Sequence, residues 1–205
     1  MKAMKSVLIT AFEPYDRWKT NSSWLALVQL THDLPREPAV TTRLYPVDFS
    51  EVKRRLAEDL AANYDYALHL GQAPGSGRIQ LESIGVNVGG SSSQTPDQYR
   101  PLADDGPVAY QSPLPLGEWS VLLRRSGVPA QVSHHAGTFL CNATLYLSCY
   151  FAERMALQTQ SAFLHLPLDC SQTAGLREDL ASMPATMSAS ALRAILTELA
   201  RGDLV

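Results

Sequence analysis

The chain has 205 residues, of which 45% are hydrophobic and 18% charged, and its formal net charge is −3 at pH 7. This balance is typical of a globular protein and excludes a strongly basic nucleic-acid-binding protein, because no long block of Lys and Arg is present. Its apolar runs are shorter than the roughly 18 residues that a membrane-spanning helix needs. We therefore expect one domain over residues 1–205, with no nucleic-acid partner and no membrane partner.

Three cysteines, Cys141, Cys149 and Cys170, are too few and too scattered for a disulfide framework. The first apolar segment follows only five residues and is too short for the core of a signal peptide. Both features favour a cytoplasmic protein. No C-x-x-C pair occurs and no histidine lies at a usual zinc spacing from the cysteines, so we expect neither a metal site nor a cofactor.

The first half of the chain alternates strand and helix signals. Short apolar runs rich in β-branched residues predict strands over residues 6–12, 39–45, 66–70 and 79–88. The side chains of Asn21, Ser22 and Ser23 are suited to cap a helix that begins near Trp24. Ser50 is expected to cap a second helix that ends near Asn63.

The second half opens with a Gly-, Ser- and Pro-rich stretch, residues 89–117. A loop this long in a compact domain is usually functional, and we expect it to lie over a site and to contain one short strand pair. Beyond it the pattern predicts two strands, over residues 130–133 and 161–166. It also predicts helices over residues 116–125, 143–158 and, capped by Ser188, 188–200, with Gly202 closing the last one.

Strands that alternate with helices predict an α/β fold, a three-layer α/β/α sandwich with a mostly parallel or mixed twisted sheet. Functional groups in such folds gather at the carboxyl ends of the strands. Polar residues follow or end four of the predicted strands at Glu13, Gln72, Cys141 and His165. These strand ends are where we look for a site.

Cys141 lies between a small-residue turn and an apolar helical run. The positive end of a helix dipole and the free backbone N–H groups there favour a thiolate, which is the nucleophilic form. A lone cysteine is nevertheless more often a buried packing residue. Taken alone, the position allows both interpretations.

Two further residues extend the nucleophile hypothesis. His165 lies inside an apolar strand, where it is either a hydrogen-bonded core histidine or the base that takes a thiol proton. Glu82 is either solvated on an exposed strand face or the carboxylate that orients the imidazole. The local sequence does not show that Glu82, Cys141 and His165 meet.

Four blocks resemble the pyroglutamyl peptidase I (pyrrolidone-carboxylate peptidase) family. The first is Thr-Ala-Phe-Glu-Pro-Tyr at residues 10–15, followed by Asn21. The second is Gly-Gln-Ala at residues 71–73, followed by Arg78, Glu82 and Asn87. The third and most specific is the nucleophile motif at residues 133–142, and the fourth is the histidine block at residues 163–167, followed by Gln172 and Thr173.

The resemblance implies a cysteine exopeptidase that removes an N-terminal pyroglutamyl residue from small peptides with a blocked N-terminus. It implies that Cys141 is the nucleophile, His165 its base and Glu82 the residue that orients the base. It also implies a lactam pocket and a homo-oligomer. The residues expected at the pocket are Phe12, Tyr15, Asn21, Gln72, Phe139 and Leu140.

The chain departs from the family pattern at several of these blocks. Tyr15, Asp16, Ser22 and Ser83 stand where the family has Phe, Gly, Pro and Arg. Gln94 stands in the place of an arginine expected near the nucleophile and becomes the candidate donor to the oxyanion. Three alternatives therefore stay open: a related cysteine amidase acting on another small acyl amide or lactam, a catalytically weakened member, and a non-catalytic binding protein.

Overall fold

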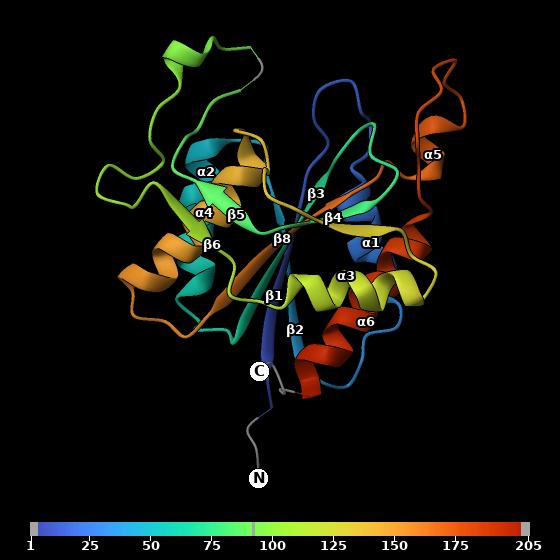
Figure 1. Cartoon of the computed structure of the whole chain (residues 1–205), viewed down its shortest axis with the longest axis horizontal. Coiled ribbons are helices and arrows are strands. Elements are labelled where there is room, and N and C mark those ends of the chain that lie inside the picture. The colour runs from blue at the N-terminus through green and yellow to red at the C-terminus, as the bar shows by residue number, and fades with distance from the viewer. Residues whose placement is uncertain (1–3, 92, 202–205) are drawn as a thin grey trace.

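The computed structural model describes residues 4–91 and 93–201 (Figure 1). A six-stranded sheet forms its centre, in the order β2-β1-β3-β8-β4-β7. A small second sheet pairs β5 with β6. The strands are β1 (Ser6–Phe12), β2 (Ala39–Tyr45), β3 (Tyr66–Gln72), β4 (Ile79–Glu82), β5 (Ile84–Val86), β6 (Ala109–Gln111), β7 (Ala130–Ser133) and β8 (Gln160–Leu166).

The main sheet is mixed. Its strand pairs are parallel except for β4 and β8, which run antiparallel. The strand predicted over residues 79–88 is interrupted at Ser83, where the chain leaves the main sheet and enters β5. The strand pair expected within the long loop is present in part, because β6 of that loop pairs with β5, which precedes it.

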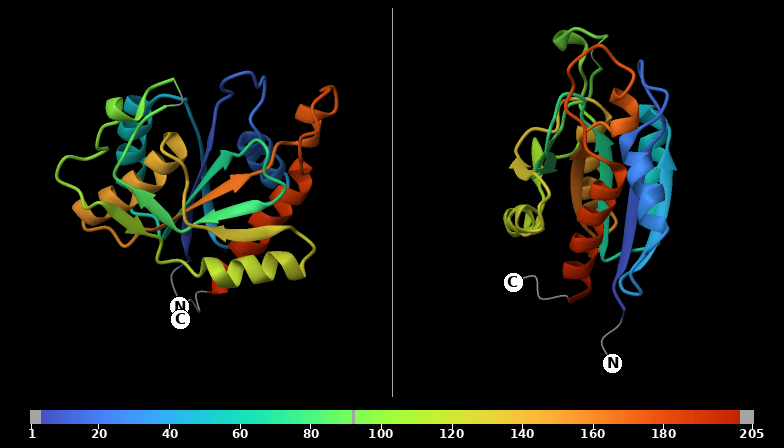
Figure 2. Two further views of the ribbon diagram at one scale, coloured as in Figure 1. Left: turned by 45° about the horizontal axis from the view of Figure 1, so that its top comes forward. Right: turned by 90° about the vertical axis from the view of Figure 1, so that its right-hand side faces the viewer.

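Helices cover both faces of the sheet, which confirms the three-layer prediction (Figures 1 and 2). Helices α2 and α4 pack on one face, and α1, α3 and α6 pack on the other. The helices are α1 (Ser22–Thr31), α2 (Phe49–Leu60), α3 (Leu116–Arg125), α4 (Leu140–Arg154), the short α5 (Cys170–Thr173) and α6 (Ala185–Arg201), with a 3₁₀ turn at Pro96–Gln98. Within residues 4–91 and 93–201, none of these helices is both long and apolar enough to cross a membrane.

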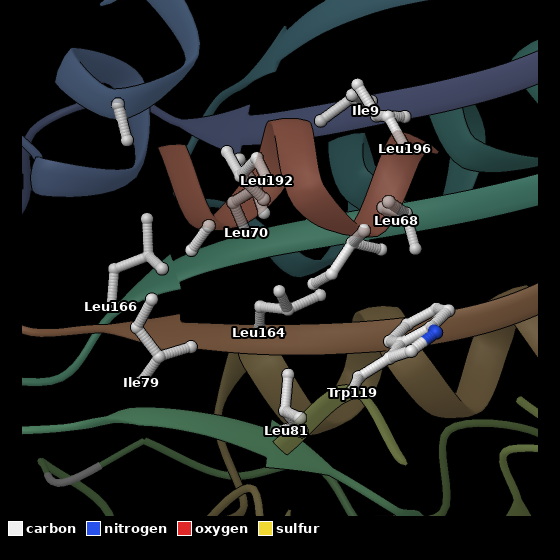
Figure 3. Close-up of a cluster of buried hydrophobic side chains, with 14 of the residues drawn as sticks. Ile9, Leu68, Leu70, Ile79, Leu81, Trp119, Leu164, Leu166, Leu192 and Leu196 are labelled. Atoms are coloured by element: carbon white, nitrogen blue, oxygen red, sulfur yellow. The ribbon is translucent and has the colours of Figure 1, made fainter. Parts of the chain in front are cut away.

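The larger core lies between the sheet and α1, α3 and α6. Figure 3 shows Leu68 of β3 and Leu164 of β8 facing Leu192 and Leu196 of α6, all fully buried. Strands β3 and β8 are central, so both faces of each are covered. This is why the two strands read as continuous apolar runs instead of alternating ones. The rigid centre that results carries Gly71, Gln72 and His165 at its carboxyl edge.

Helix starts differ from the predictions where the cap comes from elsewhere. Helix α2 begins at Phe49 because Asp48, not Ser50, accepts from the backbone N–H of Glu51. Helix α6 begins at Ala185, three residues before Ser188, because the Asp169 carboxylate accepts from the Ala185 N–H. A cap donated across 16 residues leaves no local sequence signal. Gly202, predicted to close α6, lies outside the described residues.

A buried polar chain crosses from the sheet to α4 through His69. Its Nδ1 lies 2.8 Å from Oγ1 of Thr10 and its Nε2 lies 2.9 Å from Oγ of Ser148. Ser148 in turn contacts Oγ of Ser161 at 2.7 Å. Complete burial lowers the pKa of His69 to about 3, so the imidazole is neutral and hydrogen-bonded on both nitrogens.

This neutral histidine predicts an acid-sensitive fold. Between pH 6.5, its ordinary pKa, and about 3, the unfolded chain binds a proton at His69 that the folded chain does not. We expect the free energy of unfolding to fall as the pH is lowered through this range, with His69 contributing up to about 1.4 kcal/mol per pH unit. Urea unfolding at several pH values should give a smaller slope for His69→Gln than for the wild type. Equal slopes would contradict the prediction.

Candidate active site

Three side chains from β4, β8 and the start of α4 meet beside the carboxyl edge of the sheet. The Nδ1 atom of His165 lies 2.7 Å from Oε1 of Glu82. Since a carboxylate only accepts, Nδ1–H donates and Nε2 is the ring nitrogen left for the hydrogen bond with the Cys141 side chain. The structure thus brings together the Glu82, His165 and Cys141 that the sequence singled out separately.

The electrostatics of this group favour a charged imidazole. Burial alone would lower the pKa of His165, but the Cys141 sulfur and the Glu82 carboxylate raise it above its ordinary value. Glu82 is 1% exposed and its Oε2 has no hydrogen-bond partner among the described residues. A buried carboxylate with one partner is costly unless that partner is positive. The arrangement is therefore suited to a thiolate–imidazolium pair backed by a carboxylate.

Glu82 reaches this position because β4 runs antiparallel to β8, so the carboxyl end of β4 lies beside the middle of β8. Glu82 is paired with Phe163, two residues before His165. Residues in this diagonal relation share one face of an antiparallel pair, so the carboxylate of Glu82 and the imidazole of His165 lie on the same face and can meet.

Cys141 is the second residue of α4. No side chain caps this helix, and its first backbone bond runs from the Ala143 N–H to the Phe139 carbonyl. The N–H groups of Leu140, Cys141 and Asn142 therefore lack helical acceptors and carry the positive end of the dipole. Such N–H groups at a helix start are suited to stabilise a thiolate or an oxyanion.

A small pocket opens beside the thiol, with a cavity volume of about 30 Å³. All six residues predicted for a lactam pocket line it, together with Val47, Gly71 and Cys141 itself. The walls are mostly apolar, and Gln72 and Asn21 supply amide groups. Apolar walls with a few amide groups are chemically suited to a compact neutral ring.

Gln94 is not brought to this pocket. It lines a separate cleft with Phe49, Lys53 and Arg100, and its Oε1 accepts from the Ser91 N–H at 2.9 Å. The loop is held on the α2 side because Lys53 donates to the Leu102 carbonyl. Gln94 as oxyanion donor therefore needs a movement of this loop.

Comparison with known proteins agrees with this geometry. The sequence model of the pyroglutamyl peptidase family matches residues 5–201. The chain belongs to the pyroglutamyl peptidase family. The chain is 30% identical over 202 residues to a pyrrolidone-carboxylate peptidase of Staphylococcus aureus, covering 96% of this chain and 94% of that protein. It is 34% identical over 205 residues to one of Streptomyces coelicolor, covering 97% and 93%.

Solved structures give the same family likeness. The pyrrolidone carboxyl peptidase of Fervidobacterium islandicum superposes with a TM-score of 0.89 at 32% identity, covering 95% of this chain and 98% of that one. The enzyme of Thermococcus litoralis gives 0.84 at 26% identity, covering 97% and 94%. The pyroglutamyl peptidase fold is thus retained over nearly the whole chain.

Asn142 follows the cysteine in the family motif. Its side chain holds the start of α4 in place, which local sequence did not reveal. Its Oδ1 accepts from the Val86 N–H, and its Nδ2 donates to the carbonyls of Val86 and Val88. Each is 2.8–2.9 Å long, and the side chain is fully buried. These bonds tie the first turn of α4 to β5 and to the segment that follows it.

Gly71 is required by close approach to the nucleophile. A methyl group there would lie 2.9 Å from Sγ of Cys141 and 2.6 Å from Cζ of Phe163. We expect Gly71→Ala to lower kcat at least tenfold and to destabilise the fold by about 1–3 kcal/mol, as overpacking does. Steady-state kinetics and thermal melts measure both. Gly77→Ala is the matched control, since its methyl group would meet Ala181 at an ordinary 3.5 Å; equal behaviour of the two variants would contradict the prediction.

Proposed function

We propose that this protein is a cysteine exopeptidase that hydrolyses the amide bond after an N-terminal pyroglutamyl residue. The observation that carries the proposal is the Glu82–His165–Cys141 contact beside an apolar pocket that Gln72 helps to line. The substrates are small peptides whose N-terminus is blocked by the lactam. One catalytic domain carries the whole reaction, and it needs no cofactor.

The lactam ring is recognised by a paired donor and acceptor from Gln72. A lactam is a cis amide, so its N–H and C=O lie on one edge. The Gln72 side chain has a buried Nε2 that finds no hydrogen-bond partner in the described part of the chain, and this group donates to the lactam oxygen. The Gln72 backbone carbonyl, already 3.5 Å from the Tyr15 hydroxyl, accepts from the lactam N–H. A ring lacking either group leaves buried polar atoms unpaired and binds less well.

The chemistry follows from the triad. The Cys141 thiolate attacks the carbonyl carbon of the scissile amide, not that of the lactam, and forms a C–S bond. The oxygen of that carbonyl becomes an oxyanion near the α4 N–H groups. The intermediate collapses as the C–N bond breaks and the His165 imidazolium protonates the leaving amine. Water then attacks the thioester, gives its proton to His165 and releases pyroglutamic acid with the thiolate restored.

A fluorogenic pyroglutamyl amide tests the proposal. Wild-type protein should release the fluorophore between pH 6 and 9, and prior alkylation with iodoacetamide should stop the release. The proposal fails if no release occurs over this range. A panel of cyclopentanecarbonyl, prolyl and acetyl amides ranks the pyroglutamyl ring against other small acyl groups by kcat/KM.

A related amidase activity is the second candidate, and Tyr15 favours it. Burial raises the pKa of Tyr15 to about 12, with Cys141 and Asp16 adding to the shift, so its hydroxyl stays a proton donor in the pocket wall. A phenylalanine there would offer no such group. An acyl group with one more acceptor than pyroglutamate would use it, and the substrate panel extended with hydroxylated lactams separates the two activities.

Cellular setting and assembly belong to the same proposal. We place the protein in the cytoplasm, because all three cysteines are free thiols and suit a reducing compartment. We also propose that it forms a homo-oligomer. Sedimentation equilibrium gives the mass of the assembly, and a monomer at micromolar concentration would contradict this part.

A further inference from the structure

The orientation of the Gln72 carboxamide is set by a backbone group of Ser22. Its Oε1 lies 2.8 Å from the backbone nitrogen of Ser22. A backbone N–H only donates, so the atom facing it is the carbonyl oxygen and the amide nitrogen faces the other way. That nitrogen is buried and has no partner among the described residues, so it is free for a ligand in the pocket.

A second amide, Gln172, supports the same orientation. Its Oε1 accepts from the Asp169 N–H at 2.8 Å as part of the cap of α5. Its Nε2 donates to the Thr20 carbonyl at 3.0 Å and to Oε1 of Gln72 at 2.7 Å. Backbone atoms again fix which end is which: Asp169 supplies a donor and Thr20 an acceptor.

The two contacts act on a single atom from different segments. Ser22 is the first residue of α1, and Gln172 belongs to α5, 150 residues further along the chain. Both present a donor to Oε1 of Gln72, so a rotated amide would set its NH₂ group against two donors. The reversed state would place an acceptor where the lactam carbonyl binds.

We infer that the Ser22 backbone N–H and the Gln172 side chain are positioning groups that lock Gln72 as a donor to the lactam carbonyl. The inference rests on the proposed function for the identity of the ring, but the lock itself concerns ligand binding and not turnover. Gln172 does not line the lactam pocket. It acts through Gln72 and is therefore a specificity determinant one residue removed from the substrate.

Substitutions at residue 22 isolate one half of the lock. Proline at the first helical position, the residue that the family has there, removes the N–H together with the hydroxyl and suits the helix, and the extended backbone of Asn21 suits a following proline. Ser22→Ala is the comparison, because it removes the hydroxyl and keeps the N–H. The Ser22 hydroxyl is buried without a partner in the described structure, so its loss breaks no bond.

Substitution of Gln172 reverses the other half. In Gln172→Glu, a carboxylate still accepts from the Asp169 N–H but repels Oε1 of Gln72 and attracts its NH₂ group. The double variant Ser22→Pro/Gln172→Glu removes both donors and favours the rotated amide. Gln98→Glu is the matched control, since Gln98 holds the same position in the cap of the 3₁₀ turn and lies outside the pocket.

The readout is protection of Cys141 from iodoacetamide by 2-pyrrolidinone, together with KM for a pyroglutamyl amide. We expect the unprotected alkylation rate to stay within about twofold in all variants, because the triad is untouched. The lactam dissociation constant should rise about fivefold in Ser22→Pro relative to Ser22→Ala, as for the loss of one hydrogen bond. It should rise roughly fiftyfold or more in the double variant, where an acceptor meets the lactam carbonyl.

The outcomes separate this inference from the proposed function. If 2-pyrrolidinone protects the wild type but the wild type hydrolyses no pyroglutamyl amide, the proposed function is rejected. The protection measurements on the variants still test the positioning of Gln72 in that case. Equal protection of wild type and the double variant overturns the lock, whatever the turnover. A fall of unprotected alkylation in Ser22→Pro without selective loss of protection overturns it as well, because the effect is then on the whole site.

Discussion

Cys141→Ala should reduce kcat for a pyroglutamyl amide by roughly 10⁶-fold, as removal of a nucleophile does in other hydrolases of this kind. The reason is that the sulfur supplies the bond that replaces the scissile amide. Residual binding should persist, because the walls formed by Phe12, Phe139 and Leu140 are unchanged. Burst and steady-state fluorescence with the wild type and the variant measure the ratio.

The other two cysteines provide the matched controls. Cys149 is half-buried within α4, where desolvation of its thiol raises its pKa to about 12, and Cys170 is exposed on α5. Cys149→Ala and Cys170→Ala should keep kcat within about threefold of the wild type, since neither thiol touches the pocket. Full activity of Cys141→Ala, or loss of activity in Cys170→Ala with Cys141 intact, would reject Cys141 as the nucleophile.

Glu82→Gln should lower kcat by roughly 10³- to 10⁴-fold, the loss seen when a buried triad carboxylate becomes an amide. Glutamine keeps the shape but removes the charge that, together with Cys141, raises the pKa of His165. The imidazolium then loses its counter-charge, and an amide NH₂ placed against Nδ1 favours the wrong tautomer. KM should change much less than kcat, since Glu82 does not line the pocket.

Alkylation separates the electrostatic effect of Glu82 from a general disruption. The rate of Cys141 alkylation at neutral pH should fall in Glu82→Gln. Without the Glu82 carboxylate, His165 is less often protonated, and a neutral imidazole stabilises the thiolate less well. Glu153→Gln is the control: Glu153 also accepts one short hydrogen bond, 2.6 Å from the Tyr110 hydroxyl, but lies near the far end of α4. Wild-type kcat in Glu82→Gln would mean that His165 needs no orienting carboxylate.

Much of the fold was readable from local patterns. The strand at residues 6–12, the helix at residues 116–125 and the strand at residues 130–133 were predicted with the bounds that the structure has. Each carries its own periodicity and its own turn residues. Errors arose where a distant group acts on the backbone, as when Asp169 starts α6 before Ser188. Local sequence patterns do not show which distant side chain will contact the first N–H of a helix.

The residue types of the site were also readable, although their assembly was not. Four sequence blocks resembling one family named the cysteine, the histidine, the glutamate and the six pocket residues. Gln94 shows the limit of position matching. It occupies the place of a family arginine in the sequence, but the structure turns its loop toward α2, where Lys53 holds it.

The amino-acid sequence by itself therefore determined the family, the layer order and the side chains available for chemistry, because these follow from local periodicity and from short motifs. Only the tertiary structure decided which groups meet. The antiparallel direction of β4 brings the Glu82 carboxylate to the His165 ring. Ser22 and Gln172, which are far apart in the sequence, both donate to one oxygen of Gln72. Hydrogen bonds depend on distances of a few tenths of an ångström between distant segments, and only the packed sheet and its helices set such distances.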